Sequence, residues 1–296
     1  MRVVVGFQDT GAGRDALALG ARLAASSGGE LHVVLVLAST ERATLAPPEA
    51  GFTRYLEQAA LEWLAGAQEW LARHDRGVPG GATTHLRWAE SGAEGLLEAA
   101  RELDAALVVV GAARGGIAGR FRVSGVANAL LHAAEVPVAL APKKLRSSPA
   151  AGVSRVTAAI GLRPGASDVM SASIRLADAL GARLRLLSLV AIDEEGLGTS
   201  DAAAAAAHAH VSTVLEGVHE TLPDGVAADT LVARGATFSQ AVVAVDFAGD
   251  ELVVVGSSRL ASAGRLFLGA TASRMLRELP VPMVVVPRDA VMGEQS

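Results

Sequence analysis

Short apolar runs alternate with longer stretches of helical periodicity along the whole chain. In the longer stretches apolar residues recur at steps of three and four, whereas the short runs are apolar at nearly every position. Strands that are apolar throughout and alternate with helices are typical of a parallel sheet covered on both faces. In the first half this pattern predicts strands at 3–6, 31–38, 83–89, 107–111 and 136–141, and helices at 13–26, 51–74, 92–103 and 126–134.

The second half repeats this order of elements. Strands are predicted at 155–161, 183–191, 228–233, 251–256 and 281–286, and helices at 167–180, 200–221, 237–248 and 270–279. Between the halves lies a basic, then small and proline-containing stretch that is typical of a linker. We predict an α/β chain of two doubly wound domains, each with a five-stranded parallel or mostly parallel sheet and about four helices. The predicted boundaries are 1–145 and 154–290 for the domains, 146–153 for the linker and 291–296 for a tail.

One phrase occurs twice, after the fourth strand of each half. Residues 108–142 read VVVGAARGGIAGRFRVSGVANALLHAAEVPVALAP, and residues 253–287 read VVVGSSRLASAGRLFLGATASRMLRELPVPMVVVP. Aligned without a gap, 13 of these 35 positions are identical. Self-similarity at half the chain length indicates two copies of one domain. A site in one copy therefore has a corresponding position in the other.

Composition narrows the class of protein. The 296 residues include no cysteine, which excludes disulfides, thiolate metal sites and cysteine nucleophiles. The net charge is −5 and no dense Lys/Arg block occurs, so we expect no nucleic-acid partner. The apolar runs are much shorter than the roughly 20 residues needed to span a bilayer, and no signal peptide is evident. We expect a soluble, cytoplasmic protein without membrane contact.

The loop after the fourth predicted strand is the first candidate for a binding site, because ligands of doubly wound sheets bind beyond the carboxyl ends of the strands. Its glycines allow close approach of the main chain to a phosphate, and the following helix offers free N–H groups. Two interpretations of this loop remain at this point: an anion-binding loop, or a tight turn whose arginines are solvated. The candidate residues are Gly111, Arg114, Gly119, Arg120, Ser124 and Gly125 in the first copy, and Gly256, Arg259, Gly264, Arg265, Gly269 and Thr271 in the second.

The repeated phrase resembles the C-terminal signature of the universal stress protein family, G-x2-G-x9-G-(S/T) followed by a helix and a P-V-x-V-V strand. The resemblance covers nearly the whole chain. It implies a Rossmann-like fold and pairing through the fifth strands, which in a tandem chain makes an intramolecular pseudo-dimer; a homodimer of chains is a further alternative. In nucleotide-binding members the glycines wrap the ATP phosphates, the final Ser or Thr donates to them, and an Asp after strand one holds the nucleoside.

The chain departs from the family pattern at the positions that hold ATP. The second glycine is replaced by Arg114 and Arg259, and the strand-one Asp by Gln8. In the first copy the final pair is inverted, as Ser124-Gly125. A guanidinium in place of bare main chain either fills the phosphate position or binds a different anion. Since each unpaired ligand group costs about 1–3 kcal/mol, we expect weak or absent ATP binding, with the second copy more degraded.

These observations favour a tandem universal stress protein that acts as a non-catalytic regulatory or stress-response binding module with weakened or lost nucleotide binding. The alternative is an ATP- or AMP-binding switch that uses the glycine-rich loops. No cofactor is required on this interpretation, and ATP, another small anion or a protein partner are the candidates for what is bound. No catalytic residue and no metal ligand is expected, and slow nucleotide hydrolysis is the one activity left open.

Histidines and aromatic residues carry weaker signals. His32 and His85 fall in predicted strands, where packing is the expected role, and His132 is expected at a surface or an interface. Three aromatic residues share one side of the second predicted helix. We expect them to form a core or domain-packing stripe, with a partner-binding stripe as the alternative: Tyr55, Trp63 and Trp70.

Overall fold

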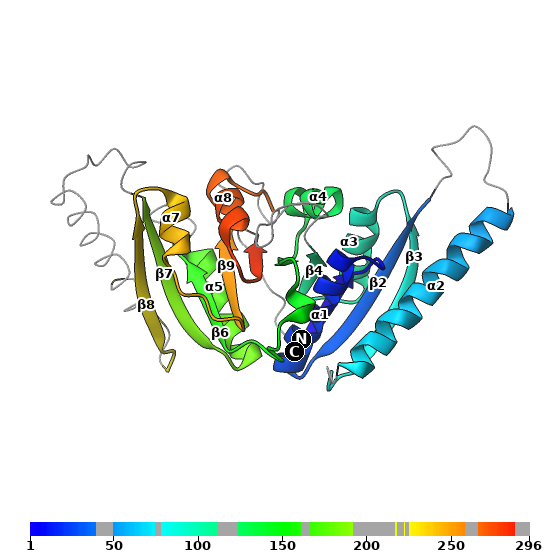
Figure 1. Ribbon diagram of the computed structural model, residues 1–296, viewed down its shortest axis with the longest axis horizontal. Coiled ribbons are helices and arrows are strands. Elements are labelled where there is room, and N and C mark those ends of the chain that lie inside the picture. The colour runs from blue at the N-terminus through cyan, green and yellow to red at the C-terminus, as the bar shows by residue number, and fades with distance from the viewer. Residues whose placement is uncertain are drawn as a thin grey trace.

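In the computed structural model of the chain, the two halves join into one ten-stranded sheet (Figure 1). The strand order is β3-β2-β1-β4-β5-β10-β9-β6-β7-β8, and all neighbouring strands are parallel except the central pair β5 and β10. The predicted α/β class and mostly parallel sheet are therefore confirmed. The structure describes residues 1–39, 50–74, 78–111, 124–160, 166–191, 217, 222, 225–257 and 266–287.

The first half follows the predicted order of elements closely. Helix α1 begins where the Thr10 hydroxyl accepts the Gly13 N–H, and it ends at Gly28, whose φ of 62° needs the freedom of glycine. The elements of this half are β1 (Arg2–Gly6), α1 (Gly11–Ser27), β2 (Glu30–Ala38), α2 (Ala50–Arg73), β3 (Ala82–Ala89), α3 (Gly92–Glu102), β4 (Leu107–Gly111), α4 (Gly125–Ala133) and β5 (Val138–Ala141).

The second half repeats this order, and some of its elements are shorter than predicted. The predicted helix at 237–248 ends at Val243, and the predicted strand at 155–161 ends at Ala159. The predicted helix at 200–221 lies outside the described residues, except for Gly217. The elements here are a 3-10 turn η1 (Leu145–Ser147), β6 (Arg155–Ala159), α5 (Ala166–Leu180), β7 (Arg183–Ala191), β8 (Ala228–Gly235), α7 (Phe238–Val243), β9 (Glu251–Gly256), α8 (Ala270–Glu278) and β10 (Met283–Val286).

The sheet, rather than the boundary between the halves, divides the apolar core. Helices α1, α2 and α5 pack on one face, and α3, α4, α7 and α8 pack on the other. Along each strand successive side chains alternate between the faces, so that Val3 and Val5 join one cluster and Val4 joins the other. Each cluster contains residues of both halves, and the two copies therefore share their cores.

The junction between the halves lies at the centre of the sheet. Antiparallel β5 and β10 pair Ala139 with Val284. Next to them, the chain that precedes α8 lies along the end of α4, where the Leu266 N–H donates to the Ala134 carbonyl at 2.9 Å. The rings of His132 and of Phe267, in the second half, meet edge to face, with their centroids 4.9 Å apart. His132 thus lies at a contact between the halves.

The aromatic side of α2 is largely exposed. Tyr55 is 68% and Trp63 is 43% exposed, whereas Trp70 packs partly against the core. The prediction of a buried stripe is therefore wrong for Tyr55 and Trp63, because α2 covers the last strands at the edge of the sheet (Figure 1). None of the described helices has an apolar segment long enough to cross a membrane.

Candidate functional site

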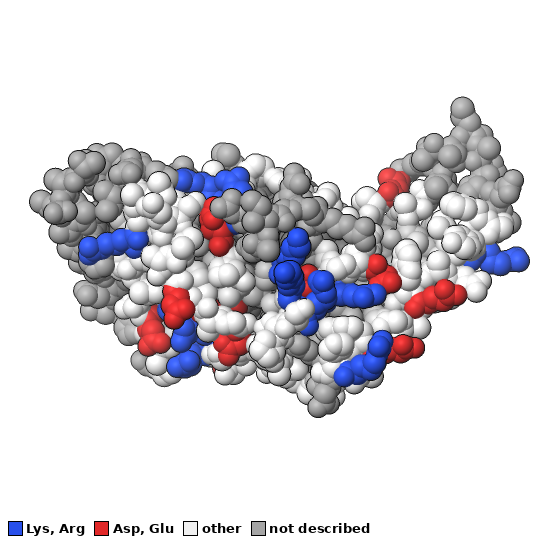
Figure 2. Space-filling view, viewed as in Figure 1, with Lys and Arg blue, Asp and Glu red and all other residues white. Residues whose placement is uncertain are grey.

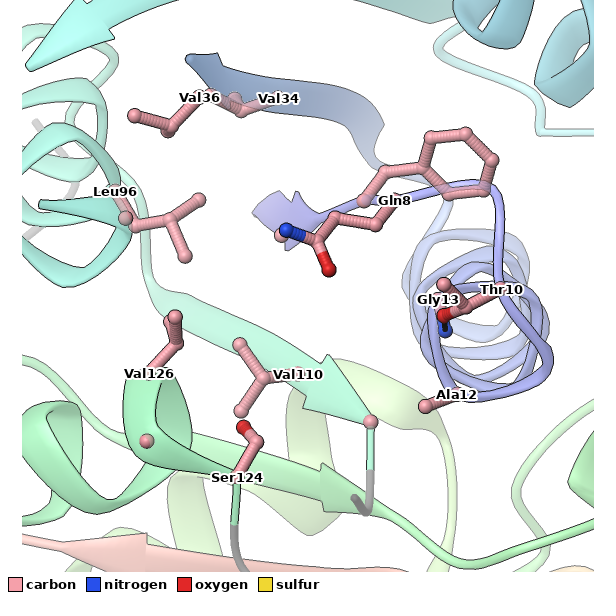
Figure 3. Close-up of a pocket in the computed structure, with 15 residues that line it drawn as sticks. Gln8, Thr10, Ala12, Gly13, Val34, Val36, Leu96, Val110, Ser124 and Val126 are labelled. Atoms are coloured by element: carbon pink, nitrogen blue, oxygen red, sulfur yellow. Dashed lines mark hydrogen bonds between the residues drawn. The ribbon is translucent and has the colours of Figure 1, made fainter. Parts of the chain in front are cut away.

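A pocket of about 510 Å³ opens beyond the carboxyl ends of β1 and β4 in the first half (Figure 3). Strand β1 pairs with β2 on one side and with β4 on the other, so the order of strands switches at this point. Doubly wound sheets bind ligands at such switch points. The lining residues are Gly6, Phe7, Gln8, Thr10, Ala12, Gly13, Val34, Val36, Gly92, Leu96, Val110, Gly111, Ser124, Gly125 and Val126.

Two glycines allow the start of α1 to lie directly on the strand ends. A Cβ atom at Gly13 would stand 2.0 Å from the carbonyl oxygen of Gln8. One at Gly111 would stand 2.0 Å from the carbonyl oxygen of Ala12. No side chain fits at either distance, because both neighbours are main-chain atoms. Glycine at these positions therefore fixes the floor of the pocket.

Three helices present their N-terminal ends to the pocket. Each of α1, α3 and α4 has a hydroxyl cap that accepts a main-chain N–H, and these caps are Thr10, Ser91 and Ser124. The first turns of α1 and α4 contain no acidic residue. Because a helix N-terminus carries partial positive charge, this end of the sheet favours an anion. The Ser124 oxygen accepts from Ala127 at 3.0 Å, which leaves its O–H free to donate.

The walls of the pocket are apolar. Val36, Leu96 and Val126 face the open space, and the Gln8 amide is directed toward its middle (Figure 3). An amide offers both a donor and an acceptor without charge. The pocket therefore suits a ligand with a flat or apolar part against the walls and an anionic part at the helix ends.

The structure brings together some of the residues that the sequence singled out. Gln8, Gly111, Ser124 and Gly125 line the pocket. Asp9, next to Gln8, pairs instead with Arg14 at 2.7 Å and does not line the pocket. The remaining first-copy candidates lie outside the described residues: Arg114, Gly119 and Arg120.

Sequence reasoning missed the part of the pocket that comes from β2 and α3. Val36 and Gly92 lie more than 50 positions apart, and only the strand order brings them together. The one local signal was the Ser91-Gly92 pair directly after the third strand, where a serine is a typical helix cap. It indicated the start of a helix but not a ligand site.

The second half has larger side chains at three corresponding positions. By strand register, Gly6 and Val34 correspond to Ala159 and Leu187. The helix after the third strand of each half begins with Gly92 in the first half (α3) and with Phe238 in the second (α7).

The Phe238 ring takes up space between α7 and α8. It is buried, and the guanidinium of Arg274 on α8 lies over it, 5.1 Å from its centroid. The corresponding position of the first half is Gly92, where a Cβ atom would lie 3.0 Å from Cγ2 of Val126. The first-half pocket thus depends on a glycine that the second copy lacks.

The second-copy candidates are spread along β9 and α8. Gly256 ends β9, and Gly269 caps α8 without a side-chain hydrogen bond. Thr271 is exposed on the first turn of α8. Three further candidates lie outside the described residues: Arg259, Gly264 and Arg265. Among the described residues, no group of three or more His, Asp and Glu side chains is placed to hold a metal ion.

A model of the universal stress protein family matches residues 1–142 and, a second time, residues 152–287. The chain belongs to the universal stress protein family. It is a tandem member, with one copy of the family domain in each half. Universal stress proteins of Mycobacterium tuberculosis and Mycobacterium bovis are each 28% identical to it over 297 residues, which cover 97% of this chain and all of the relative.

Solved structures agree on the fold. A universal stress protein of Archaeoglobus fulgidus superposes with a TM-score of 0.63 at 16% identity, over 97% of this chain and 98% of that one. A functionally unknown protein of Pseudomonas aeruginosa gives a TM-score of 0.54 at 15% identity, over 98% and 94%. At these identities the similarity concerns the fold alone.

Proposed function

We propose that this tandem universal stress protein is a non-catalytic regulatory binding module. Its working site is the first-half pocket, which takes a small anionic ligand with a flat apolar part and binds ATP weakly. The observation that carries this proposal is the convergence of three helix N-termini on a pocket with apolar walls.

Weak nucleotide binding is supported by the chemistry of the pocket. Gln8 supplies a neutral amide where the family pattern has a carboxylate. The second half carries Phe238 where the first has Gly92, which supports a single ligand per chain. Ser124 retains an O–H that can donate to an anion.

The absence of catalysis is supported by the polar side chains that line the described part of the pocket. These are Gln8, Thr10 and Ser124, and none of them exchanges a proton near neutral pH. The Thr10 and Ser124 oxygens are already engaged as helix caps. A regulatory role would then follow from ligand binding alone, through a protein partner that distinguishes the ligand-bound chain from the ligand-free chain.

An ATP- or AMP-binding switch is the second candidate. The volume of about 510 Å³ lies within the usual range for small-molecule sites and favours this alternative. The β5–β10 pairing supports an intramolecular pseudo-dimer as the working unit in either case. We place this unit in the cytoplasm, as the sequence predicts.

Calorimetric titration of the full chain with magnesium ATP, AMP and inorganic phosphate tests the proposal. We expect weak binding, with a Kd of about 0.1 mM or above, one ligand per chain and no phosphate release from ATP. Such a ligand at 100 times its Kd would stabilise the fold by about 2.7 kcal/mol. A sub-micromolar Kd would favour the switch, and no binding of any of the three would overturn an anion site.

The two arginines of the repeated phrase sharpen this test. If Arg114 occupies the phosphate position, Arg114→Gly raises the affinity for ATP. If Arg114 instead binds the anion, the same change lowers it. Arg259→Gly in the second half is the matched control, and we expect it to leave the affinity unchanged.

A further inference from the structure

Residues 142–148 form a strap that leaves β5 and lies along α1. The strap is held by Asp15, a buried carboxylate on the second turn of this helix. Its oxygens accept the main-chain N–H groups of Lys144 and Arg146, each at 3.0 Å, and the Arg146 guanidinium at 2.9 Å. Residues 142–148 are thus fixed to α1 of the first half.

The strap is held in a conformation that it would not adopt alone. Lys144 has a φ of 68°, in the left-handed region that a lysine rarely occupies. Such a residue is strained and persists only where its surroundings impose the conformation. Here the imposing contact is the hydrogen bond from the Lys144 N–H to Asp15. Loss of that contact would therefore remove a constraint on the conformation of the strap.

The strap and the second half meet at one buried side chain, Arg22, two turns further along α1. Its guanidinium donates to the carbonyl oxygens of Leu145 and Ser148 at 3.3 Å each. It also reaches the carbonyl of Gly249 at 3.5 Å, in the loop before β9. Because Arg22 is only 1% exposed, any movement of the strap must be matched by movement around this residue.

The strap also contacts the turn of α1 that lines the pocket. Arg146 donates to the carbonyl of Gly11 at 3.1 Å, in the first turn of α1. Thr10, Ala12 and Gly13 of the same turn line the pocket. A ligand that displaces this turn therefore displaces an acceptor of Arg146.

We propose that the strap is a coupling device between the first-half pocket and the second half. In one state Lys144 is left-handed and Asp15 and Arg22 hold the strap. In the other the first turn of α1 has shifted, Lys144 has relaxed, and the loop before β9 has lost its contact with Arg22. The natural trigger is the ligand of the proposed function, so the proposal rests on that function for its trigger but not for its mechanics.

Hydrogen exchange on the full chain tests the coupling, read in peptides that cover 142–148 and 247–253. The two perturbations are saturating magnesium ATP and, without any ligand, Gly92→Phe, which places at the lining of the pocket the residue that stands at the corresponding position of the second half. We expect either one to change exchange in both peptides about fivefold or more, the lower range of typical coupling between sites. Gly66→Phe is the matched control, since a Cβ at Gly66 meets nothing within 4 Å.

A pair of aspartates at the start of α1 tests the mechanism. Asp15→Asn weakens the hold on Lys144, so we expect faster exchange in 142–148 and no further response to either perturbation. Asp9→Asn breaks only the exposed pair with Arg14 and serves as the control with an unchanged response. A response that persists in Asp15→Asn would overturn the strap as the connection.

The two proposals fail in different ways. If ATP does not bind but Gly92→Phe alters both peptides, the nucleotide site fails and the coupling stands. If ATP binds but neither perturbation alters exchange at 142–148 and 247–253, the coupling is wrong and the site stands. No change with Gly92→Phe in the absence of ATP binding also overturns the coupling. Gly92→Leu replaces Gly92→Phe should the larger side chain prevent folding.

Discussion

The two halves share one order of elements but differ in the polar side chains that their strands carry. The first half has a pocket with apolar walls at the carboxyl ends of its strands, into which three helix N-termini point. The second half buries a polar cluster in β6, β7 and β9, where the first half has two apolar residues and a histidine. The buried side chains are Thr157, Arg185 and Glu251, and strand register matches them with Val4, His32 and Ala106.

The buried cluster of the second half is held by Glu251. This carboxylate accepts hydrogen bonds from Arg185 and Thr157 and from the Ala248 N–H at 3.1 Å. Burial lowers the pKa of Arg185, and the charge of Glu251 opposes this shift. The difference between the halves shows that the apolar pattern fixes the shared frame, while the positions of polar groups are free to diverge within it.

The largest effect on this comparison is expected from Glu251→Ala. It leaves Arg185 buried without its carboxylate, and breaking such a pair costs about 3–5 kcal/mol of the free energy of unfolding. Denaturant titration measures the loss. Glu69→Ala is the control, because Glu69 forms only an exposed pair with Arg73, and it should change stability by less than about 0.5 kcal/mol. A loss below about 1 kcal/mol for Glu251→Ala would contradict the role given to the cluster.

Gly92→Phe should make the first half resemble the second. The phenyl ring would enter the pocket, and we expect the affinity for the anionic ligand to fall about 100-fold, which corresponds to about 2.7 kcal/mol. Calorimetric titration beside Gly66→Phe measures this. An unchanged affinity would place the ligand outside the pocket.

The helix caps differ between the halves by a smaller amount. Ser124 caps α4 with its hydroxyl, whereas Gly269 caps α8 without a side chain. Ser124→Ala should therefore lower the free energy of unfolding by about 1 kcal/mol. Gly269→Ser should raise it by a few tenths of a kcal/mol. Thermal unfolding of both variants checks the pair, and a gain from Ser124→Ala would refute the capping role.

The smallest effect concerns pH and the first half alone. His32 and His85 share a hydrogen bond of 3.1 Å between β2 and β3. Burial lowers the pKa of His85 below 6.5, as do the nearby His32 and Arg87. The unfolded chain then binds a proton at a higher pH than the folded chain. This contribution to stability is present above about pH 6.5 and is lost as the pH falls toward the lower folded value.

His85→Gln tests this dependence. The unfolding midpoint should depend less steeply on pH between pH 7.5 and 5 in this variant than in the parent chain. His74→Gln, at the exposed end of α2, should leave the pH dependence of the midpoint unchanged. Since His85 is only partly buried, water screens much of the effect. Equal slopes in all three proteins would remove His85 as the source.

Most of the fold followed from periodicity and from the repeated phrase, because both report local and duplicated structure. Helix α7 is shorter than predicted although the apolar spacing continues past Val243. There Phe247 packs against the Arg185 guanidinium at 5.6 Å, a contact between distant parts of the chain that no local pattern contains. In the same way, periodicity gave the common side of Tyr55 and Trp63 but not the exposure of both side chains.

Apart from Gln8, the candidate site was predicted only where it lies in the repeated phrase. Gly111 and Ser124 were found from the glycine-rich loop after the fourth strand and from its resemblance to the family signature. Val36 and Gly92 reach the pocket through the order of strands, which depends on pairing between distant segments. The shape and the apolar walls of the pocket were therefore beyond the sequence, even though its general place at the switch point was not.

Acidic and basic side chains are interspersed on the face seen in Figure 2, without grouping by half. What ties the halves together is the antiparallel contact of β5 and β10 within a single chain. Partners on one polypeptide meet at a fixed effective concentration, so dilution cannot separate them as it separates a dimer of single-domain chains. Because the two copies are linked, neither copy needs a surface that pairs with a second copy of itself. Covalent linkage would thus have allowed the first copy to keep the proposed ligand site while the second copy kept only its structural contact with the first.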